Sequence, residues 1–340
     1  MQQAYQMWYK NKHFCISFRQ GLARKMLYTT IVLISLLFSS CRHPMAQAVF
    51  DEAFMLLYPD LSQAVASKFQ LDSVASPGAA TQLLEKMTDP KTTDNQSLKI
   101  IIASPSVTPV IQEFASKGCF ALINLLTPAN GFYSVEWDNA WAYRQIGLLA
   151  GYRLAVLQKE TDKNASAALL FARGIGRSDT ELEVFNRAFR ESYLRATMGT
   201  EQENSSNQAA IMPENALKVF DVDNLNLPGD RLEQVLSVVE QIEEIKPSVL
   251  IFACTSRLAL EKTCEIQGID IIADIRGLGK DIPHKKLFAS LGENRSNLLR
   301  ALLKTVKEIE DGNTEPHSVY LKPSLELSKE ARRIQQELKP

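Results

Sequence analysis

The chain has 340 residues, a hydrophobic fraction of 45% and a formal net charge of −1, from 38 basic and 39 acidic side chains. A chain of this length can bury sizeable cores in two domains, and its hydrophobic fraction is that of a soluble globular protein. Because acids and bases are interspersed and nearly balanced, we expect neither a nucleic-acid groove nor an electrostatic membrane patch.

The N-terminal segment has the layout of a bacterial lipoprotein signal. It contains no acidic residue before Cys41, and the apolar run Met26–Ser40 follows two basic residues. Small residues precede Cys41, as a signal peptidase requires, although Leu37 lies four places before it rather than the commoner three. The run is shorter than the roughly 20 residues that span a bilayer, which disfavours the alternative of an uncleaved anchor. We therefore expect residues 1–40 to be removed and Cys41 to be acylated, on a cell membrane facing the periplasm or the exterior.

The cysteines that follow Cys41 do not suggest a metal site. Cys119, Cys254 and Cys264 form no CxxC pair and have no histidine cluster of metal-ligand spacing beside them. We expect no zinc and no other cofactor. Cys254 and Cys264 could form a disulfide in an oxidising compartment, but Cys254 ends an apolar run, which favours a free thiol in the core.

From Ala48 onward, short apolar runs alternate with amphipathic helical patterns, which is typical of a parallel sheet covered by helices. The strands expected are Phe54–Tyr58, Lys99–Ser104, Cys119–Leu126, Ala167–Ala172, Leu217–Val222, Val249–Ala253, Ile269–Ala273, Leu287–Leu291 and His317–Leu321. The helices expected are Pro59–Lys68, Thr81–Met87, Pro109–Lys117, Asn139–Lys159, Glu181–Met198, Arg231–Lys246, Ser256–Gln267 and one that Ser296 caps.

The aromatic segment Thr127–Asp138 separates two successive sets of strands and helices. Two such sets predict an α/β protein with two doubly wound parallel-sheet lobes, joined by a hinge. Ligands of such sheets bind beyond the carboxyl ends of the strands, so we expect a binding cleft between the lobes. The expected segments are 41–136 and 278–312 for the first lobe, 137–277 and 313–325 for the second, and 326–340 for a charged tail.

Three segments resemble segments of a known family in their residue pattern. Trp137–Asn139 followed by Ile146–Gly151 resembles the first helix after an interlobe crossing. Gly174–Asp179 resembles a loop at which the second lobe meets ligand, and Ala289–Asn294 resembles the segment that returns to the first lobe. Together with the order of elements over Val49–Lys322, they resemble a type I periplasmic solute-binding protein, the receptor component of an ABC importer. Among its subfamilies, the basic membrane protein group, which includes lipid-anchored purine-nucleoside receptors, is the most similar.

The chain departs from the sugar-binding relatives of that family in two places. Where they have an Asp-Arg pair after the last strand of the first lobe, this chain has Leu125-Leu126-Thr127. Their Asn-Asp pair after a second-lobe strand is replaced by Thr255-Ser256. Fewer charged groups are then available to hold sugar hydroxyls, so the resemblance implies a more apolar or planar solute, with a nucleoside as the first candidate.

Two kinds of side chain are candidates for contact with such a solute. Phe132, Tyr133 and Trp137 lie near the crossover and could stack on a planar ring, the alternative being that they pack the hinge. Arg173 and Arg177 follow a second-lobe strand, where a guanidinium could hold a carboxylate, phosphate or carbonyl, the alternative being a solvated surface position.

Further candidates are polar residues at strand ends. Asp274 ends the strand Ile269–Ala273, and the resemblance implies that it contacts ligand hydroxyls, although a turn cap is the alternative. Asn294 lies in the returning segment. The hydroxyl residues beyond strand ends, which more often cap helices, are Ser104, Ser106, Thr255 and Ser256.

No catalytic motif accompanies these candidates. Gly174–Ser178 is neither a phosphate-binding loop nor a nucleophile elbow, and His284 and His317 lie in no motif of a catalytic base. No DNA-binding helix-turn-helix precedes the lobes. We expect a non-enzymatic, lipid-anchored receptor that binds a small solute for an ABC permease. The alternative is an orphan lipoprotein of the same fold that acts as an adhesin, a sensor or a structural surface protein.

Overall fold

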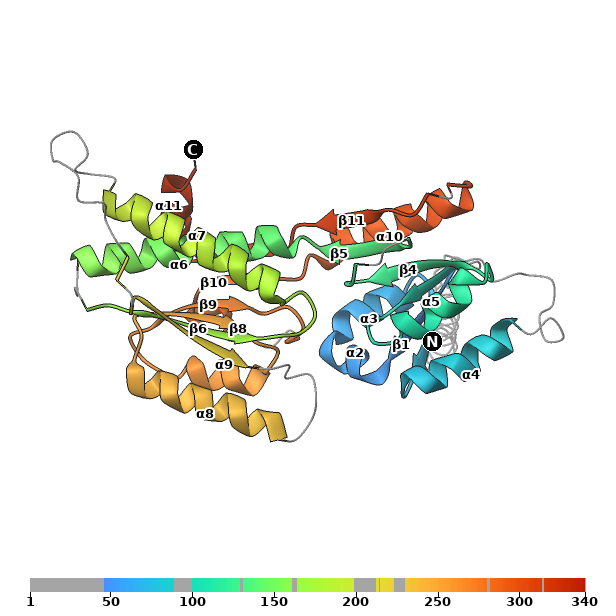
Figure 1. The fold of residues 1–340 in the computed structure, drawn as a ribbon, viewed down its shortest axis with the longest axis horizontal. Coiled ribbons are helices and arrows are strands. Elements are labelled where there is room, and N and C mark those ends of the chain that lie inside the picture. The colour runs from blue at the N-terminus through green and yellow to red at the C-terminus, as the bar shows by residue number, and fades with distance from the viewer. Residues whose placement is uncertain are drawn as a thin grey trace, which may run out of the picture.

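The computed structural model shows two α/β lobes, each built on a six-stranded sheet (Figure 1). The expected lipoprotein signal and Cys41 lie outside the residues that the structure describes. Those residues are 46–88, 100–128, 131–160, 164–198, 212–213, 215–222, 230–279, 282–313 and 315–339.

The first sheet has the strand order β11-β5-β4-β3-β1-β2, and its strands are all parallel. They are β1 (Ala46–Asp51), β2 (Gln70–Val74), β3 (Ile100–Ala103), β4 (Ala121–Leu125), β5 (Tyr133–Trp137) and β11 (Ser318–Leu321). The isoleucine run forms β3 because both faces of this strand are covered. Ile100 and Ile102 lie in one hydrophobic core, and Ile101 lies in the other.

The second sheet has the strand order β12-β10-β9-β8-β6-β7. Only the edge strand β12 is antiparallel, to β10. The strands are β6 (Ala167–Ala172), β7 (Leu217–Val222), β8 (Val249–Ala253), β9 (Asp270–Asp274), β10 (Leu287–Gly292) and β12 (Ser324–Leu327). The expected α/β class with two doubly wound lobes is confirmed.

Helices cover both faces of each sheet, and the apolar residues of each helix face the strands. Those of the first lobe are α2 (Glu52–Leu57), α3 (Pro59–Ala66), α4 (Pro77–Thr88), α5 (Thr108–Ser116) and α10 (Arg295–Glu310). Those of the second lobe are α6 (Asn139–Glu160), α7 (Asp179–Met198), α8 (Asp230–Ile245), α9 (Arg257–Thr263), the 3-10 turn η1 (His284–Lys286) and α11 (Lys329–Glu337).

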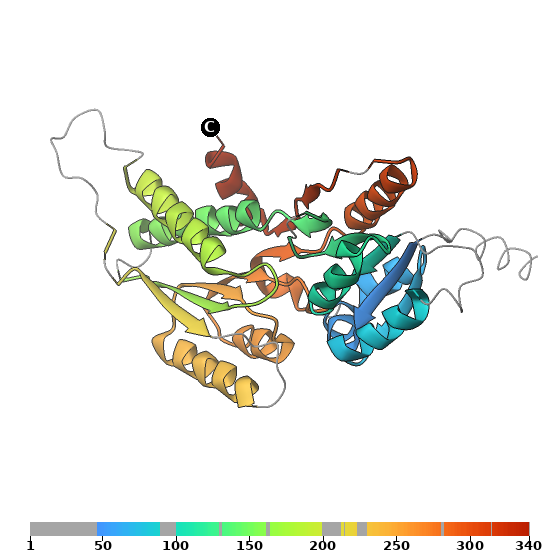
Figure 2. The ribbon, with the colours of Figure 1, turned by 45° about the vertical axis from the view of Figure 1, so that its right-hand side comes forward.

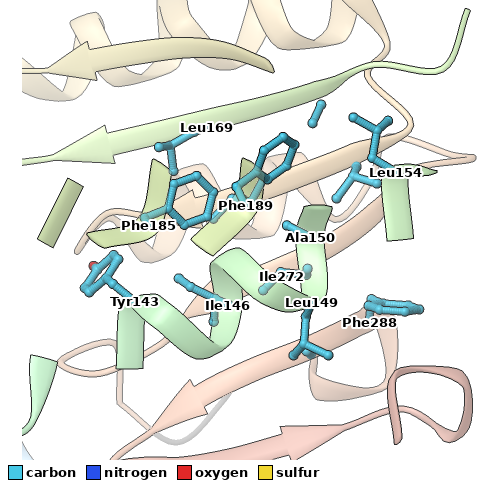
Figure 3. Close-up of a cluster of buried hydrophobic side chains, with 14 of the residues drawn as sticks. Tyr143, Ile146, Leu149, Ala150, Leu154, Leu169, Phe185, Phe189, Ile272 and Phe288 are labelled. Carbon is cyan, nitrogen blue, oxygen red and sulfur yellow. The ribbon is translucent and has the colours of Figure 1, made fainter. Parts of the chain in front are cut away.

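The long helices α6 and α7 pack closely against each other over one face of the second sheet. Figure 3 shows Ile146 of α6 beside Phe185 and Phe189 of α7, with Leu169 of β6 in the same buried cluster. A Cβ at Gly151 of α6 would overlap the backbone carbonyl oxygen of Phe189. The glycine therefore allows this close approach of the two helix backbones.

The structure corrects the expected lobe boundaries. The sequence analysis assigns residues 278–312 to the first lobe, but β10 pairs with β9 in the second sheet. The chain crosses only after β10, because α10 packs in the first-lobe core and β11 pairs with β5. It then returns to the second lobe through β12. The lobes are thus joined by three crossings, β5 to α6, β10 to α10 and β11 to β12 (Figures 1 and 2).

The segment expected to be a charged tail, either helical or frayed, is largely helical and is also part of the second lobe. Residues 326–340 include the end of β12 and helix α11. Ala331 and Ile334, one turn apart, are buried in the core of this lobe. Two apolar residues at this spacing suffice to dock a helix whose other positions are charged or polar.

The first expected strand is wrong. Phe54–Tyr58 is not a strand, because Glu52–Leu57 forms helix α2 and the strand precedes it as β1. The Asp51 carboxylate accepts a hydrogen bond from the Phe54 backbone N–H at 2.9 Å and so caps this helix. The strands β2, β5 and β12 were not expected either.

Cys254 and Cys264 are buried free thiols, as the core interpretation predicts, so they form no disulfide. In the described part of the chain, no helix combines the length and apolar character that crossing a membrane requires.

Candidate functional site

The candidate site lies between the lobes, where the carboxyl ends of the two sheets face each other. In Figure 1 the arrowheads of β4 in the first lobe and β6 in the second point toward the opposite lobe. Parallel strands bring their carboxyl-terminal loops to one edge of a sheet, so polar residues after several strands converge there.

Asp274, the last residue of β9, is the centre of a buried cluster on the second-lobe side. Its carboxylate accepts two guanidinium hydrogen bonds from Arg276, from Nε to Oδ1 at 2.8 Å and from Nη2 to Oδ2 at 2.7 Å. The Tyr143 hydroxyl donates to Oδ2 at 3.0 Å, and Arg177 Nη1 lies 3.5 Å from the same oxygen. None of these four side chains is more than 4% exposed.

The electrostatics of this cluster keep its charges fixed. Burial by itself would raise the pKa of Asp274, but the Arg276 charge and hydrogen bonds outweigh it and lower the pKa to about 2. Burial by itself would likewise lower the pKa of Arg276, but the neighbouring carboxylate raises it. Burial raises the pKa of Tyr143, so its hydroxyl keeps its proton at neutral pH.

A small cavity between the lobes adjoins this cluster and has a volume of about 10 Å³, roughly that of one water molecule. It is enclosed by both lobes and by the start of α6. The lining residues are Tyr58, Leu126, Trp137, Asn139, Ile175, Gly176, Arg177 and Arg276.

The lobes touch around this cavity. Ile175, in the loop after β6 of the second lobe, packs against the hydrophobic core of the first lobe. A Cβ at Gly277, whose φ is +79°, would lie 3.0 Å from the ring of Tyr58. Burial raises the pKa of Tyr58 to about 12. The ring therefore packs against bare backbone, and its hydroxyl stays protonated.

On the first-lobe side, Asp51 at the end of β1 and Ser104 after β3 form a polar contact that sequence analysis missed. The Ser104 hydroxyl donates to Asp51 Oδ2 at 2.7 Å, and the Ser106 hydroxyl donates to the same oxygen. Ser104 and Ser106 were named as candidates, whereas Asp51 was not, because the strand it ends was not recognised. Its place directly before Glu52-Ala53-Phe54, as a helix cap, was the available signal.

A second buried polar group lies on one face of β4 and β5. The Ser134 hydroxyl donates to Glu136 Oε1 at 3.2 Å. Burial raises the pKa of Glu136, and the nearby Glu181 adds to this effect. Asn124, opposite Ser134 in the sheet, is fully buried, and its side-chain amide has no hydrogen-bond partner among the residues that the structure describes.

Neither protein-family models nor curated protein sequences match the chain, but solved structures match its fold. A solute-binding protein of an ABC transporter system from Aeropyrum pernix is 10% identical with a TM-score of 0.55, covering 87% of this chain and 80% of that one. A periplasmic solute-binding protein of an ABC transporter from Actinobacillus succinogenes is 14% identical with a TM-score of 0.51, covering 85% and 99%. The chain has the type I periplasmic-binding-protein fold.

The same fold is matched by a regulator. A transcriptional activator of the comK gene from Bacillus halodurans is 13% identical with a TM-score of 0.54, covering 86% of this chain and 95% of that one. At such identities the likeness establishes the periplasmic-binding-protein fold alone. The roles of individual residues must therefore come from the contacts in this chain.

The structure separates the three aromatic candidates. Trp137 lies at the carboxyl end of β5 and lines the interlobe cavity. Tyr133 is at the opposite end of the same strand, where its hydroxyl donates to the carbonyl oxygen of Asn313 at 2.6 Å. Phe132 packs against a first-lobe core. The expected stacking position is therefore retained for Trp137 only, while Tyr133 and Phe132 pack the lobe.

The two arginine candidates also differ. Arg177 is buried and lines the cavity beside Asp274. Arg173 is partly exposed and forms ion pairs with Asp179, at 2.7 Å, and with Asp221. The surface alternative therefore holds for Arg173.

The remaining candidates lie at strand ends, as expected, and two of them cap helices. Ser256 accepts a hydrogen bond from the Ala259 backbone N–H at 3.3 Å, at the start of α9. Asn294 accepts one from the Asn297 backbone N–H at 3.3 Å and caps α10, in place of the expected cap Ser296. Thr255 is partly buried just after β8 and does not line the cavity.

The side chains around Asp274 are mainly cations and hydrogen-bond donors. In the described ranges, no group of three His, Cys, Asp or Glu side chains could hold a metal ion. Around Asp274 the structure instead offers fixed charges and hydrogen-bond donors, which suits recognition of a polar group.

Proposed function

We propose that this protein binds a small solute between its two lobes and releases it without chemical change. One observation carries the proposal. Trp137 of the first lobe and Arg177 of the second line the same interlobe cavity, at the carboxyl ends of their sheets. In doubly wound folds this is the place where ligands bind, and closure of two lobes is a common way to enclose them.

The matched structures support this proposal by analogy. The Actinobacillus protein was solved with bound D-allose. A structural neighbour from Burkholderia graminis, 11% identical with a TM-score of 0.51, is an ABC transporter solute-binding protein in complex with D-arabinose. Solute-binding proteins and transcription regulators share this fold, so the fold does not decide between transport and regulation. The choice of transport rests on the N-terminal sequence instead.

Within this function we place the protein outside the cytoplasm, as the lipid-anchored receptor of an ABC permease. The support is the sequence before Cys41, which is basic and then apolar and ends in small residues. Mass spectrometry of the membrane-bound protein tests the anchor. We expect a diacylglyceryl mass on a chain that begins at Cys41, and loss of membrane association in the Cys41→Ser variant. A chain that keeps residues 1–40 would overturn the anchor and leave solute binding untouched.

The sequence favours a nucleoside as the solute, but fewer aromatic side chains line the cavity than the sequence suggested. Of the three aromatic side chains named for stacking on a base, Trp137 alone lines the cavity. Stacking by one indole would still suit a planar ring.

Thermal stabilisation tests solute binding directly. The full chain in detergent and its Cys41→Ser variant are each screened with nucleosides, bases, sugars, amino acids and carboxylic acids. Because a ligand that binds the folded state raises its melting temperature, one class of compound is expected to give a saturable shift. A flat panel, with no co-purified small molecule in native mass spectrometry, would instead favour the orphan surface lipoprotein.

Two aromatic residues on the same face of β5 provide matched variants. Trp137→Phe is expected to weaken binding, because it alters the cavity wall and removes the indole N–H. Tyr133→Phe, four residues earlier at the far end of the strand, is expected to leave binding unchanged. Equal effects of the two substitutions would place the solute elsewhere.

A further inference from the structure

The carboxylate at the end of β9 has no capacity left for a ligand. Asp274 Oδ1 accepts from the backbone N–H and Nε of Arg276, and Oδ2 accepts from Arg276 Nη2 and the Tyr143 hydroxyl. A carboxylate offers about four lone-pair sites. A ligand hydroxyl would therefore find no acceptor on Asp274.

The carboxylate on the first-lobe side is also engaged, with three hydrogen bonds where Asp274 has four. Asp51 Oδ1 accepts from the Phe54 backbone N–H, and Oδ2 accepts from the Ser104 and Ser106 hydroxyls. Asp51, which ends β1 of the first sheet, and Asp274, which ends β9 of the second, are thus both bound within their own lobes. Sugar hydroxyls, which must also donate hydrogen bonds, have little to donate to here.

One hydrogen-bond donor, by contrast, remains without a partner at the cavity. Trp137 is 5% exposed and its indole Nε1 has no hydrogen-bond partner among the described residues. Beside it, the buried Arg177 donates from Nε to the carbonyl oxygen of Ala172, and its Nη1 lies 3.5 Å from Asp274 Oδ2. A buried donor without an acceptor is costly, so a ligand that supplies acceptors is favoured.

The net charge of this buried cluster is positive, which favours a negatively charged ligand. Two buried guanidinium groups, Arg177 and Arg276, face the single buried carboxylate of Asp274. A further carboxylate near this cluster is that of Glu293. It accepts a hydrogen bond from the Gly277 backbone N–H at 3.0 Å and pairs with Arg295 at 3.5 Å. Arg295 also pairs with Asp60 at 2.9 Å, so this outer group is separately bonded.

We propose that the solute carries a carboxylate, and that one of its oxygens enters the interlobe cavity to accept hydrogen bonds from Arg177 and Trp137. The inference rests on the proposed function, because it specifies the ligand of that site, and it replaces the nucleoside that the sequence favours. A cavity of about 10 Å³ admits a single oxygen atom. The rest of the solute lies outside it, against the facing strand ends of the two lobes.

Pairs of compounds that differ in one group test this with the unmodified full chain in detergent. Benzoate is compared with benzamide, and succinate with succinamide, by thermal stabilisation and calorimetric titration. Uridine, D-ribose and inorganic phosphate are the other arms. We expect at least one carboxylate to bind roughly tenfold or more tightly than its amide, because hydrogen bonds to a charged group are stronger than neutral ones.

The outcomes separate the two proposals. Binding of uridine or D-ribose without binding of any carboxylate would overturn the carboxylate and leave the solute receptor standing. Binding of phosphate with equal weakness toward the acids and their amides would also overturn it. No binding by any compound of the panel would count against both proposals.

Variants then assign the contact. Arg177→Met is expected to lose the preference for carboxylate over amide, and Trp137→Phe to weaken binding of the acid by about tenfold. Arg173→Met, a nearby arginine that forms ion pairs at the surface, is the matched control and should keep the preference. Circular dichroism checks that each variant folds. If Arg177→Met does not fold, Trp137→Phe decides, because an unchanged affinity for the acid in that variant would overturn the assignment.

Discussion

The Arg276 guanidinium donates two parallel hydrogen bonds to the Asp274 carboxylate, although only one residue separates them in the chain. Such fork-like pairing is the strong form of an arginine–carboxylate contact. It forms because Asp274 ends β9 and the following turn folds the arginine back over it. The aspartate therefore acts as an internal counterion.

We expect Asp274→Asn to destabilise the protein by about 3–5 kcal/mol, because two buried guanidinium groups would lose their common carboxylate. The free energy of unfolding in urea measures the loss. Asp270→Asn is the control, since the Arg153–Asp270 pair is more exposed and should cost about 1 kcal/mol or less. Similar losses in both variants would contradict the role of Asp274.

The same contact predicts a dependence on pH. The pKa of Asp274 falls from 3.8 to about 2 on folding, so its contribution to stability is present above pH 3.8. That contribution is lost as the pH falls toward 2. The difference in unfolding free energy between wild type and Asp274→Asn should therefore shrink over this interval, and a constant difference would contradict the shift.

Glu136 predicts the opposite dependence. Burial raises the pKa of Glu136 above 4.5, so the protonated side chain contributes to the stability of the fold below pH 4.5. That contribution is lost as the pH rises through the raised pKa. Glu136→Gln keeps an acceptor for the Ser134 hydroxyl and removes the buried charge. We expect melting temperatures to show that the variant gains stability over wild type as the pH rises from 4 to 8. A gain that is the same at every pH would exclude this explanation.

Gly151→Ala tests the packing of α6 on α7. The added methyl group would overlap backbone atoms of Phe189, which cannot move as a side chain can. We expect a loss of about 1–3 kcal/mol in unfolding free energy, as for other overpacked cores. Gly78→Ala in α4 is the matched control, because the nearest atom would be 3.9 Å away. That substitution should be stabilising by about 0.5–1 kcal/mol, and a loss there would question the packing argument.

Ile175→Ser tests the contact between the lobes. Ile175 lies in a second-lobe loop but packs against the first-lobe core, so a polar side chain should favour separation of the lobes. Small-angle X-ray scattering is expected to show a larger radius of gyration. Leu157→Ser, within the second lobe, should lower stability without that increase. An unchanged radius for Ile175→Ser would mean that other contacts hold the lobes together.

Much of the fold could be predicted because its central strands are unambiguous. The isoleucines of β3 and the run Val249–Ala253 of β8 are buried on both faces, and such short apolar runs between helical patterns indicate parallel strands. The run Phe54–Tyr58 has the same apolar character but forms a helix. Periodicity cannot distinguish the two in so short a run, and the capping residue Asp51, directly before helix α2, was the signal that favours a helix.

The site could be located from the sequence but not described. Asp274 and Arg177 are candidates because they follow strands, and Trp137 because it lies near the crossover; Arg177 and Trp137 line the interlobe cavity, and Asp274 lies beside Arg177. Their bonding could not be read, because it depends on Arg276 and on Tyr143, which comes from α6 far earlier in the chain. The lobe boundaries failed for a similar reason, since which sheet accepts β10 and β11 depends on pairing with distant strands.

The three crossings are bonded to one another. The Asp138 backbone N–H, in the first crossing, donates to the carbonyl oxygen of Leu321 at 2.8 Å, and Gly292 pairs with Ser324 across the other two. Neighbouring strands that are tied in this way can flex together but resist being twisted apart. The two lobes should therefore open and close about a single hinge axis. A protease that cuts one crossing would still leave the lobes covalently joined through the others.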